Sequence, residues 1–492
     1  IELEPKVIDA NRATASLRRR DPLGDARVRV IRNDARGALR LTEHRYQAIV
    51  SQPSHPWTAG ASHLYTREFM QLAHEHLSAD GVFVQWMNVL FMDEDLVRSL
   101  TATLLSVFGD VRVYRPDPNT LVFLASDAPL EVETRLAATG LPLRDAPLHY
   151  ARYGIDNTED LVTALVLDSE GARRIAEGAH LITDDDNRIA TSSVYEKSRG
   201  MTGDSSGRFL APYDPLQRPD SVVYGALRTQ LSFPYIARRN AVFVLVDPSL
   251  TDRVGRMAHI LGESADGEYA RAYFLRMRQQ PQYFMETLRL AIDRYPDDPA
   301  LRQEFLRMHF GDLARGQAAP EIVEVAAPLQ GPAADLLAAA RSAAQGDWNA
   351  VARADQRLAE LPWTDPWYPE ALELRLNWRT RVTNAGQSRR FGDEAIPMID
   401  RMSLNNPTLS LYGMRARAGF AAGRPGVVVE SVSNYLQLAS GMLRAEVITA
   451  DGLRKDSVAL REILDDAAKM PGADPARIAE VREEIARLAP GS

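Results

Sequence analysis

Residues 46–57 decide the fold, and they read Tyr46-Gln47-Ala48-Ile49-Val50-Ser51-Gln52-Pro53-Ser54-His55-Pro56-Trp57. The stretch begins with an apolar run of strand length, at residues 47–50, and ends in a loop that two prolines interrupt. Open α/β sheets bind their ligands beyond the carboxyl ends of their strands. The pattern therefore predicts that Gln52 and His55 lie in a ligand-binding loop at the end of a strand.

Strands and helices alternate on both sides of this stretch. One helical pattern begins at Pro5 and runs towards Arg20, and another runs through Leu104. Further segments with the pattern of strands lie at residues 28–31, 81–86, 111–114 and 121–124. This alternation predicts a doubly wound α/β domain, Rossmann-like and of the methyltransferase type.

The first residues resemble the continuation of such a domain. Ile1-Glu2-Leu3-Glu4 is typical of a strand that ends in acidic residues, and in nucleotide-binding βαβ units an acid at this place holds a ribose hydroxyl. That acid follows a Gly-rich turn by about 20 residues, and this sequence holds no such turn ahead of it. We therefore expect a Rossmann-like domain that lacks its first strand and its Gly-rich loop.

Four segments together resemble the polyamine aminopropyltransferases, the spermidine synthase family. They are Ile1-Glu2-Leu3-Glu4, Asn33-Asp34-Ala35, the stretch from Tyr46 to Phe69, and Leu181-Ile182-Thr183-Asp184-Asp185-Asp186-Asn187. The resemblance spans roughly residues 1–198 and, more narrowly, is to a bacterial branch in which this domain follows a membrane-embedded region. It implies decarboxylated S-adenosylmethionine as the co-substrate, with Glu2 on its ribose and Asp34 and Ala35 on its adenine side.

The catalytic loop departs from the family. Where its active enzymes carry an acidic proton acceptor this chain has Gln52, and the second acidic position matches His55. An acceptor amine, with a pKa of about 10, must lose its proton before it can attack carbon. A carboxylate attracts the ammonium and accepts the proton, whereas an amide does neither. We therefore expect a catalytically impaired enzyme with no bound cofactor.

Two other interpretations of this loop stay open. Neutral imidazole is a competent base, so His55 can replace the missing acid in an active aminopropyltransferase, with Glu2 on the ribose and Asp34 on the adenine. Alternatively, Gln52 and His55 only satisfy backbone groups in a tight turn next to proline.

The composition excludes several classes of protein. The 492 residues are 45% hydrophobic and 25% charged, and no apolar run approaches the roughly 18 residues of a membrane span. A net charge of −8 argues against a nucleic-acid partner. Without cysteine, the chain has no disulfide, thiolate metal site or thiol nucleophile. Asp184, Asp185 and Asp186 are consecutive and cannot all face one ion, so we expect no metal site.

After residue 198 the pattern changes. Residues 199–250 are expected to form a linker or covering segment, with an apolar run of strand length at Ala241–Val246. Residues 251–492 show helical patterns only, with turn signals about every 15 to 20 positions. They resemble degenerate tetratricopeptide repeats, which implies an α-solenoid that presents a concave surface to a protein partner. A plain helical bundle is the alternative.

Four of the six tryptophans lie in this helical region, at Trp348, Trp363, Trp367 and Trp378. Trp363 and Trp367 stand in a loop broken by prolines, where aromatic rings either anchor a partner or fold back into the core. The sequence thus favours a spermidine synthase-like interaction module of a membrane-associated assembly. We expect a bacterial protein whose membrane-embedded N-terminal region is missing here, with this soluble portion on the cytoplasmic face.

Overall fold

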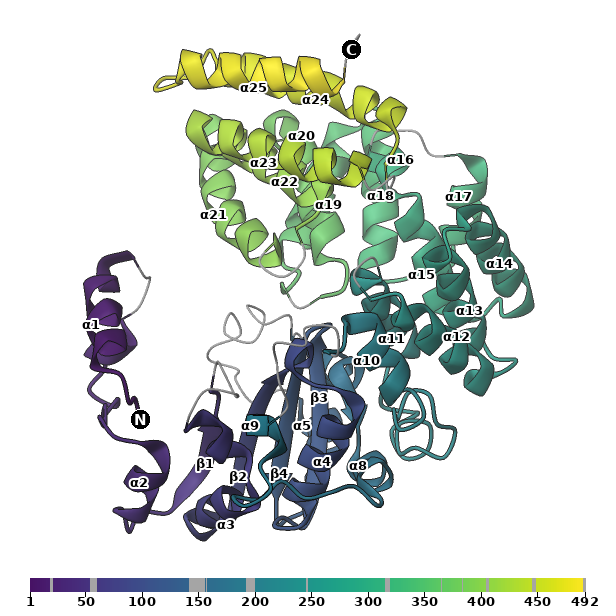
Figure 1. Cartoon of the computed structure of the whole chain (residues 1–492). Coiled ribbons are helices and arrows are strands. Elements are labelled where there is room, and N and C mark those ends of the chain that lie inside the picture. The colour runs from purple at the N-terminus through teal and green to yellow at the C-terminus, as the bar shows by residue number, and fades with distance from the viewer. Residues whose placement is uncertain are drawn as a thin grey trace. The chain divides into compact units, whose positions relative to one another are not determined.

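The computed structural model describes the whole chain except residues 18–20, 54–59, 141–154, 156, 192–199, 245–246, 315–318, 364, 383, 404–406, 445–447 and 490–492. The chain divides into two compact units (Figure 1). The first consists of Ile1–Gly140 and Asn157–Gln280, and the second of Leu141–Asp156 and Pro281–Ser492.

A mixed sheet forms the centre of the first unit. The described residues give it the strand order β1-β2-β4-β3-β5. The strands are β1 (Tyr46–Ser51), β2 (Leu77–Asn88), β3 (Asp110–Asp117), β4 (Thr120–Ser126) and β5 (Leu165–Leu167). β1 and β2 are parallel, and the other pairs are antiparallel. The predicted strands at 47–50, 81–86, 111–114 and 121–124 are therefore confirmed, and the sheet agrees with a Rossmann-like domain.

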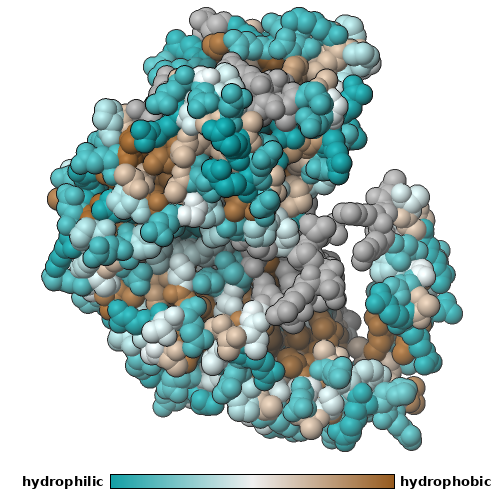
Figure 2. All heavy atoms as spheres, turned by 180° about the vertical axis from the view of Figure 1, so that it is seen from behind, coloured by the Kyte–Doolittle hydropathy of each residue, from teal (hydrophilic) through white to brown (hydrophobic). Residues whose placement is uncertain are grey.

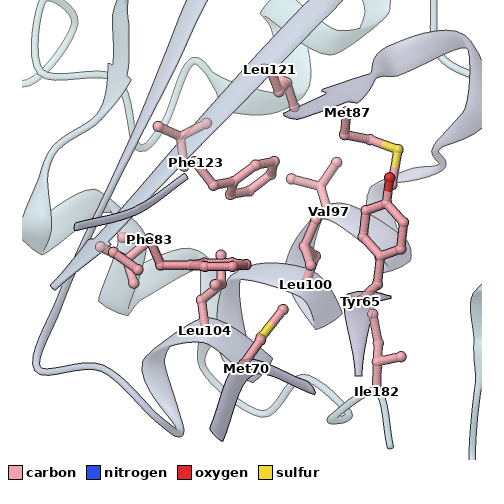
Figure 3. Packing of buried hydrophobic residues seen from close by; sticks show 14 of the residues in the cluster. Tyr65, Met70, Phe83, Met87, Val97, Leu100, Leu104, Leu121, Phe123 and Ile182 are labelled. Carbon is pink, nitrogen blue, oxygen red and sulfur yellow. The ribbon is translucent and has the colours of Figure 1, made fainter. Parts of the chain in front are cut away.

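Helices pack against this sheet and enclose its core. They are η3 (Ala61–Tyr65), α3 (Arg67–Glu75), η4 (Val89–Phe91), α4 (Glu94–Leu105), α5 (Val132–Thr139), α7 (Thr158–Ala164), α8 (Ser169–Ala176) and α9 (Arg188–Thr191). Figure 3 shows Phe83 and Phe123 of the sheet packed among Met70, Leu100 and Leu104 of the helices. Each such side chain contributes about 1.5–3 kcal/mol when it is fully buried, so this cluster stabilises the frame that carries the strand ends.

The N-terminal segment is less regular than predicted. It contains α1 (Pro5–Ala13), η1 (Ala15–Leu17), η2 (Pro22–Gly24) and α2 (Ala35–Arg40). The strand predicted at residues 28–31 is wrong: a single parallel bridge joins Glu2 and Arg32. Leu3, Val28 and Val30 are exposed, so a longer strand pair would gain little apolar burial to offset the cost of ordering the backbone.

Residues 200–280 belong to the first compact unit, and their helices pack on one another and on α7. They form α10 (Gly203–Leu210), α11 (Phe233–Asn240), η5 (Ala241–Phe243), α12 (Ser249–Leu261) and α13 (Ala265–Met277). The apolar run that begins at Ala241 starts as a short 3-10 helix, η5, over its first three residues.

Buried ion pairs hold this segment to the sheet. Arg115 of β3 pairs with Asp247, and Arg218 pairs with Asp168, the residue that caps α8. Arg253 of α12 donates to the Asp214 carboxylate at 2.7 Å and to the backbone oxygen of Leu165 in β5 at 2.8 Å. A buried charge without its partner costs several kcal/mol, so these pairs fix where the segment lies.

The second unit is helical throughout its described residues, as predicted. Its helices are α14 (Pro281–Arg294), α15 (Pro299–Met308), α16 (Phe310–Ala314), α17 (Pro320–Ala326), α18 (Pro332–Ala344), α19 (Trp348–Ala359), α20 (Tyr368–Val382), α21 (Ala385–Ser403), α22 (Leu409–Ala422), α23 (Pro425–Arg444), α24 (Ala450–Ala467) and α25 (Pro475–Leu488). Neighbours in sequence pack on one another, as in the pairs α18 and α19 or α21 and α22. Gly423 ends α22 in the left-handed conformation, which glycine adopts without strain.

The tryptophan-rich loop folds back into this unit. Trp367 is 4% exposed, and the Arg307 guanidinium lies 4.0 Å from the centre of its ring. Trp378 is buried as well, and Trp363 is half-buried beneath the Arg401 guanidinium. Of the two roles predicted for this loop, the structure assigns Trp367 to the core.

Candidate functional site

The carboxyl end of β1 delivers the predicted catalytic loop. Gln52 directly follows the strand, and its side chain is exposed. His55 lies outside the described residues. Ser51 at the strand end is paired in register with Gln85 of β2, whose side-chain nitrogen donates to the Ser51 carbonyl at 3.2 Å. The parallel pair of strands therefore places Gln52 at the edge where α/β sheets bind ligands.

Unsatisfied polar atoms lie beneath this edge. Within the described part of the chain, Ser51 Oγ, Tyr65 Oη and Gln85 Oε1 are buried without a hydrogen-bond partner. Burial raises the pKa of the Tyr65 phenol well above its usual range, so the group keeps its proton. Each unpartnered buried group costs about 1–3 kcal/mol, a cost that a water or a ligand atom removes. The edge can thus both donate and accept hydrogen bonds.

A second polar cluster centres on Asp184, within the segment that resembles the end of the family domain. Both Arg36 guanidinium nitrogens donate to its carboxylate at 2.8 Å, and the Thr66 hydroxyl donates at 2.7 Å. His63 Nδ1 lies 3.3 Å from Asp184 Oδ1. The bonds from Arg36 first, and then those from Thr66 and His63, hold the pKa of Asp184 well below its usual range. Asp184 is therefore ionised and a weak base.

This cluster joins the candidate site to the start of α3. The Asp184 amide donates to the Glu68 carboxylate at 2.9 Å, and the Arg67 amide donates to the Ile182 carbonyl at 2.8 Å. In the sequence, Asp184 stood out only as part of the segment from Leu181 to Asn187, and neither Arg36 nor His63 was singled out. One signal was available, because Arg36 directly follows the predicted Asp34-Ala35 motif.

The predicted donor-binding residues lie on neighbouring segments of the chain. The Glu2 amide donates to the Ile31 carbonyl at 2.9 Å, and Asp34 follows two residues after the bridge at Arg32. The Asp34 side chain caps α2 by accepting from the Gly37 amide, and Ala35 begins that helix. The Glu2 carboxylate accepts from the Glu4 amide. Their role in binding a nucleoside stays a prediction.

Comparison with known proteins identifies a family for the first part of the chain. Residues 1–115 match the family described as the spermine/spermidine synthase domain. The fold and the match thus agree on a domain of spermidine synthase type in this part of the chain.

Two curated relatives are enzymes with a named activity. The chain is 32% identical over 91 residues to a polyamine aminopropyltransferase of Erwinia tasmaniensis, and 33% identical over 95 residues to one of Lachnospira eligens. These alignments cover 18% and 19% of this chain, and 32% and 33% of the relatives. The chain thus spans about a third of the length of the curated relatives it matches.

The described residues were also compared with the requirements of a membrane-spanning helix and of a metal site. None of these helices combines the length and the apolar character that crossing a membrane requires. No group of three or more histidine, aspartate and glutamate side chains in the same residues is placed to hold a metal ion.

Proposed function

We propose that this chain is a spermidine synthase-like protein whose aminopropyltransferase site is impaired, and that it serves as an interaction module of a membrane-associated assembly. The observation that carries the proposal is Gln52, exposed at the end of β1 where the reaction needs a proton acceptor. An amide accepts no proton at neutral pH and gives a polyamine no countercharge.

The acidic groups near this site support the same conclusion. The Asp184 carboxylate is engaged by Arg36 and Thr66, and its lowered pKa makes it a poor base for an amine. Glu68 accepts from the Asp184 amide and pairs with Arg67. Both carboxylates are therefore already engaged in hydrogen bonds and ion pairs within the protein.

The assembly role is argued from the second unit and from the resemblance. Helices that pack on their sequence neighbours are typical of tetratricopeptide-like repeats, which bind protein partners on a concave surface. The resemblance to the membrane-fused bacterial branch supports a partner near a membrane, and we propose that it lies on the cytoplasmic face. In this role the protein retains no cofactor.

An activity assay tests the proposal. With putrescine and decarboxylated S-adenosylmethionine, we expect the purified chain to release no methylthioadenosine above background. Gln52→Asp should restore a trace of activity, because it returns a carboxylate to the strand end. Gln47→Asp is the matched control, since Gln47 is an exposed glutamine of the same strand that does not lie in the loop. Robust turnover by the unaltered chain would refute the impaired site.

A second function is favoured by the contact between His63 and Asp184. A carboxylate at Nδ1 orients an imidazole so that Nε2 can accept a proton. An active aminopropyltransferase would then use His63, or His55, in place of the missing acid, with decarboxylated S-adenosylmethionine as donor. Activity that His63→Gln or His55→Ala abolishes, while Gln52→Ala leaves it unchanged, would establish this alternative.

A further inference from the structure

A groove of about 1000 Å³ lies in the first unit, outside the residues that match the spermidine synthase family. Helices α12 and α13, which pack side by side (Figure 1), form it together with residues 211–220 and the end of α8. We call it the α12–α13 groove and define it by Pro212, Arg218, Arg256, His259, Arg271 and Phe274. Its volume is at the upper end of the range of ligand sites.

The floor of the groove is apolar and depends on one glycine. The Phe274 ring lies directly on α12 at Gly255, where a Cβ atom would come within 2.9 Å of the ring carbons. Ala258, one turn further along α12, is buried beside it, and Leu275 extends the apolar lining along α13. An aliphatic or aromatic side chain can therefore pack on this floor.

Buried ion pairs hold the segments that form the groove in place before any ligand binds. Arg253 of α12 holds the Asp214 carboxylate at 2.7 Å and 3.1 Å, and all of these atoms are buried. Arg218 donates to both oxygens of Asp168, at 2.6 Å and 2.5 Å, and is also buried. A preformed site loses little conformational entropy on binding, so its contacts contribute more to affinity.

The lining is rich in arginine although the chain as a whole is acidic. It contains four arginines and two aspartates, in a protein with a net charge of −8. Arg174 is engaged by Glu170 and Asp220, and Arg271, whose side chain is 48% exposed, pairs with Glu268 at 3.3 Å. Arg256 and His259, by contrast, are exposed and make no ion pair with the described residues, and Arg256 has only a 3.4 Å contact with a backbone oxygen.

Charge and apolar floor together point to one kind of occupant. We propose that the α12–α13 groove binds an acidic peptide segment of a partner protein, with an apolar side chain on Phe274 and carboxylates at Arg256 and Arg271. An extended segment presents alternate side chains in two directions, which suits an apolar floor beside a charged rim. This site lies outside the spermidine synthase match, so it stands whether or not the domain is catalytically impaired.

Selection from a library tests the proposal without a known ligand. A displayed library of random dodecapeptides is selected on the full chain and counter-selected on the Arg256→Glu/Arg271→Glu variant. We expect the enriched sequences to combine Asp or Glu with Leu, Ile or Phe. Failure to enrich any sequence against the variant, or enrichment of basic sequences, overturns the proposal.

Binding of one enriched peptide then locates the site. Arg256→Glu should weaken its affinity at least about tenfold, as measured by fluorescence anisotropy, because the contact becomes repulsive. The matched control is Arg173→Glu, since Arg173 is exposed next to Arg174 on α8 but does not line the groove. The proposal fails if Arg173→Glu weakens binding equally, or if a peptide with lysine at the acidic positions binds as well. Unchanged far-ultraviolet circular dichroism verifies that the variants are folded.

Discussion

At the scale of single residues, Asp184 connects parts of the chain that are far apart in sequence. Its carboxylate is bound by Arg36, 148 positions away, and by Thr66, 118 positions away. Asp184→Asn keeps the shape of the side chain but removes the charge and places an amide against the guanidinium. We expect a loss of about 1–3 kcal/mol in the free energy of unfolding at neutral pH, measured with urea. Asp185→Asn, at the exposed neighbouring position, should change it by less than about 0.5 kcal/mol.

The same carboxylate predicts how stability depends on pH. Its pKa is lower in the folded chain than in the unfolded chain, where a free aspartate titrates near 3.9. The unfolded state therefore binds the proton first, and the contribution of Asp184 is complete above about pH 5 and declines as the pH falls towards the folded pKa. Between about pH 5 and pH 3, Asp184→Asn should lose stability less steeply than the unaltered chain. Parallel curves for the two proteins would contradict this assignment.

The chemical character of single residues could be predicted from the sequence, but their hydrogen-bond and ion-pair partners could not. An amide at Gln52 excludes a proton acceptor whatever the fold. The pairing of Arg36 with Asp184 depends on how distant segments dock, and no local pattern contains that information. The same holds for Tyr65 and Gln85, whose unpartnered atoms become visible only once β1 and β2 are placed side by side.

At the scale of elements, the strand predictions were confirmed where a segment is long enough to give a clear pattern and has a neighbouring strand to pair with. The four longer strands were predicted because their apolar runs meet in a sheet, whereas β5 has three residues and gives too short a signal. The run at residues 28–31 has strand composition but pairs only through one bridge. Helix ends in the second unit could be predicted because particular residue types mark them. Asp298 caps α15, and Gly346 and Asp347 separate α18 from α19.

Helix α12 gives a prediction at this scale, because Arg253 ties it to the sheet. The guanidinium donates hydrogen bonds to the Asp214 carboxylate and to the backbone oxygens of Thr163 and Leu165. Arg253→Met leaves a buried carboxylate unpaired, so we expect a loss of about 3–5 kcal/mol in unfolding free energy. Arg256→Met, on the exposed side of the same helix, should cost less than about 0.5 kcal/mol in the same urea titration. Equal effects of the two substitutions would show that the ion pair does not hold the helix.

At the scale of the whole molecule, each unit has its own hydrophobic core. The first is built around Phe83, Leu100 and Phe123, and the second contains clusters around Ile399 and Leu436. Proline and glycine are frequent at residues 201–220, and for this reason the sequence predicted a linker or covering segment at residues 199–250. The buried arginine–aspartate pairs that join this segment to the sheet leave no mark on composition, so the boundary after Gln280 was not predictable from it.

Separate cores predict separate unfolding, since a domain with its own core can melt by itself. In calorimetry of the full chain we expect two transitions. Trp367→Ala removes a buried ring under Arg307 and should cost about 3–5 kcal/mol, lowering only the transition of the second unit. Arg253→Met should lower only the other transition, and the double variant should show both shifts unchanged, because substitutions without shared partners add. If either single substitution moved both transitions together, the chain would unfold as one cooperative unit, and Trp367→Ala would lower the stability of the first unit as well as that of the second.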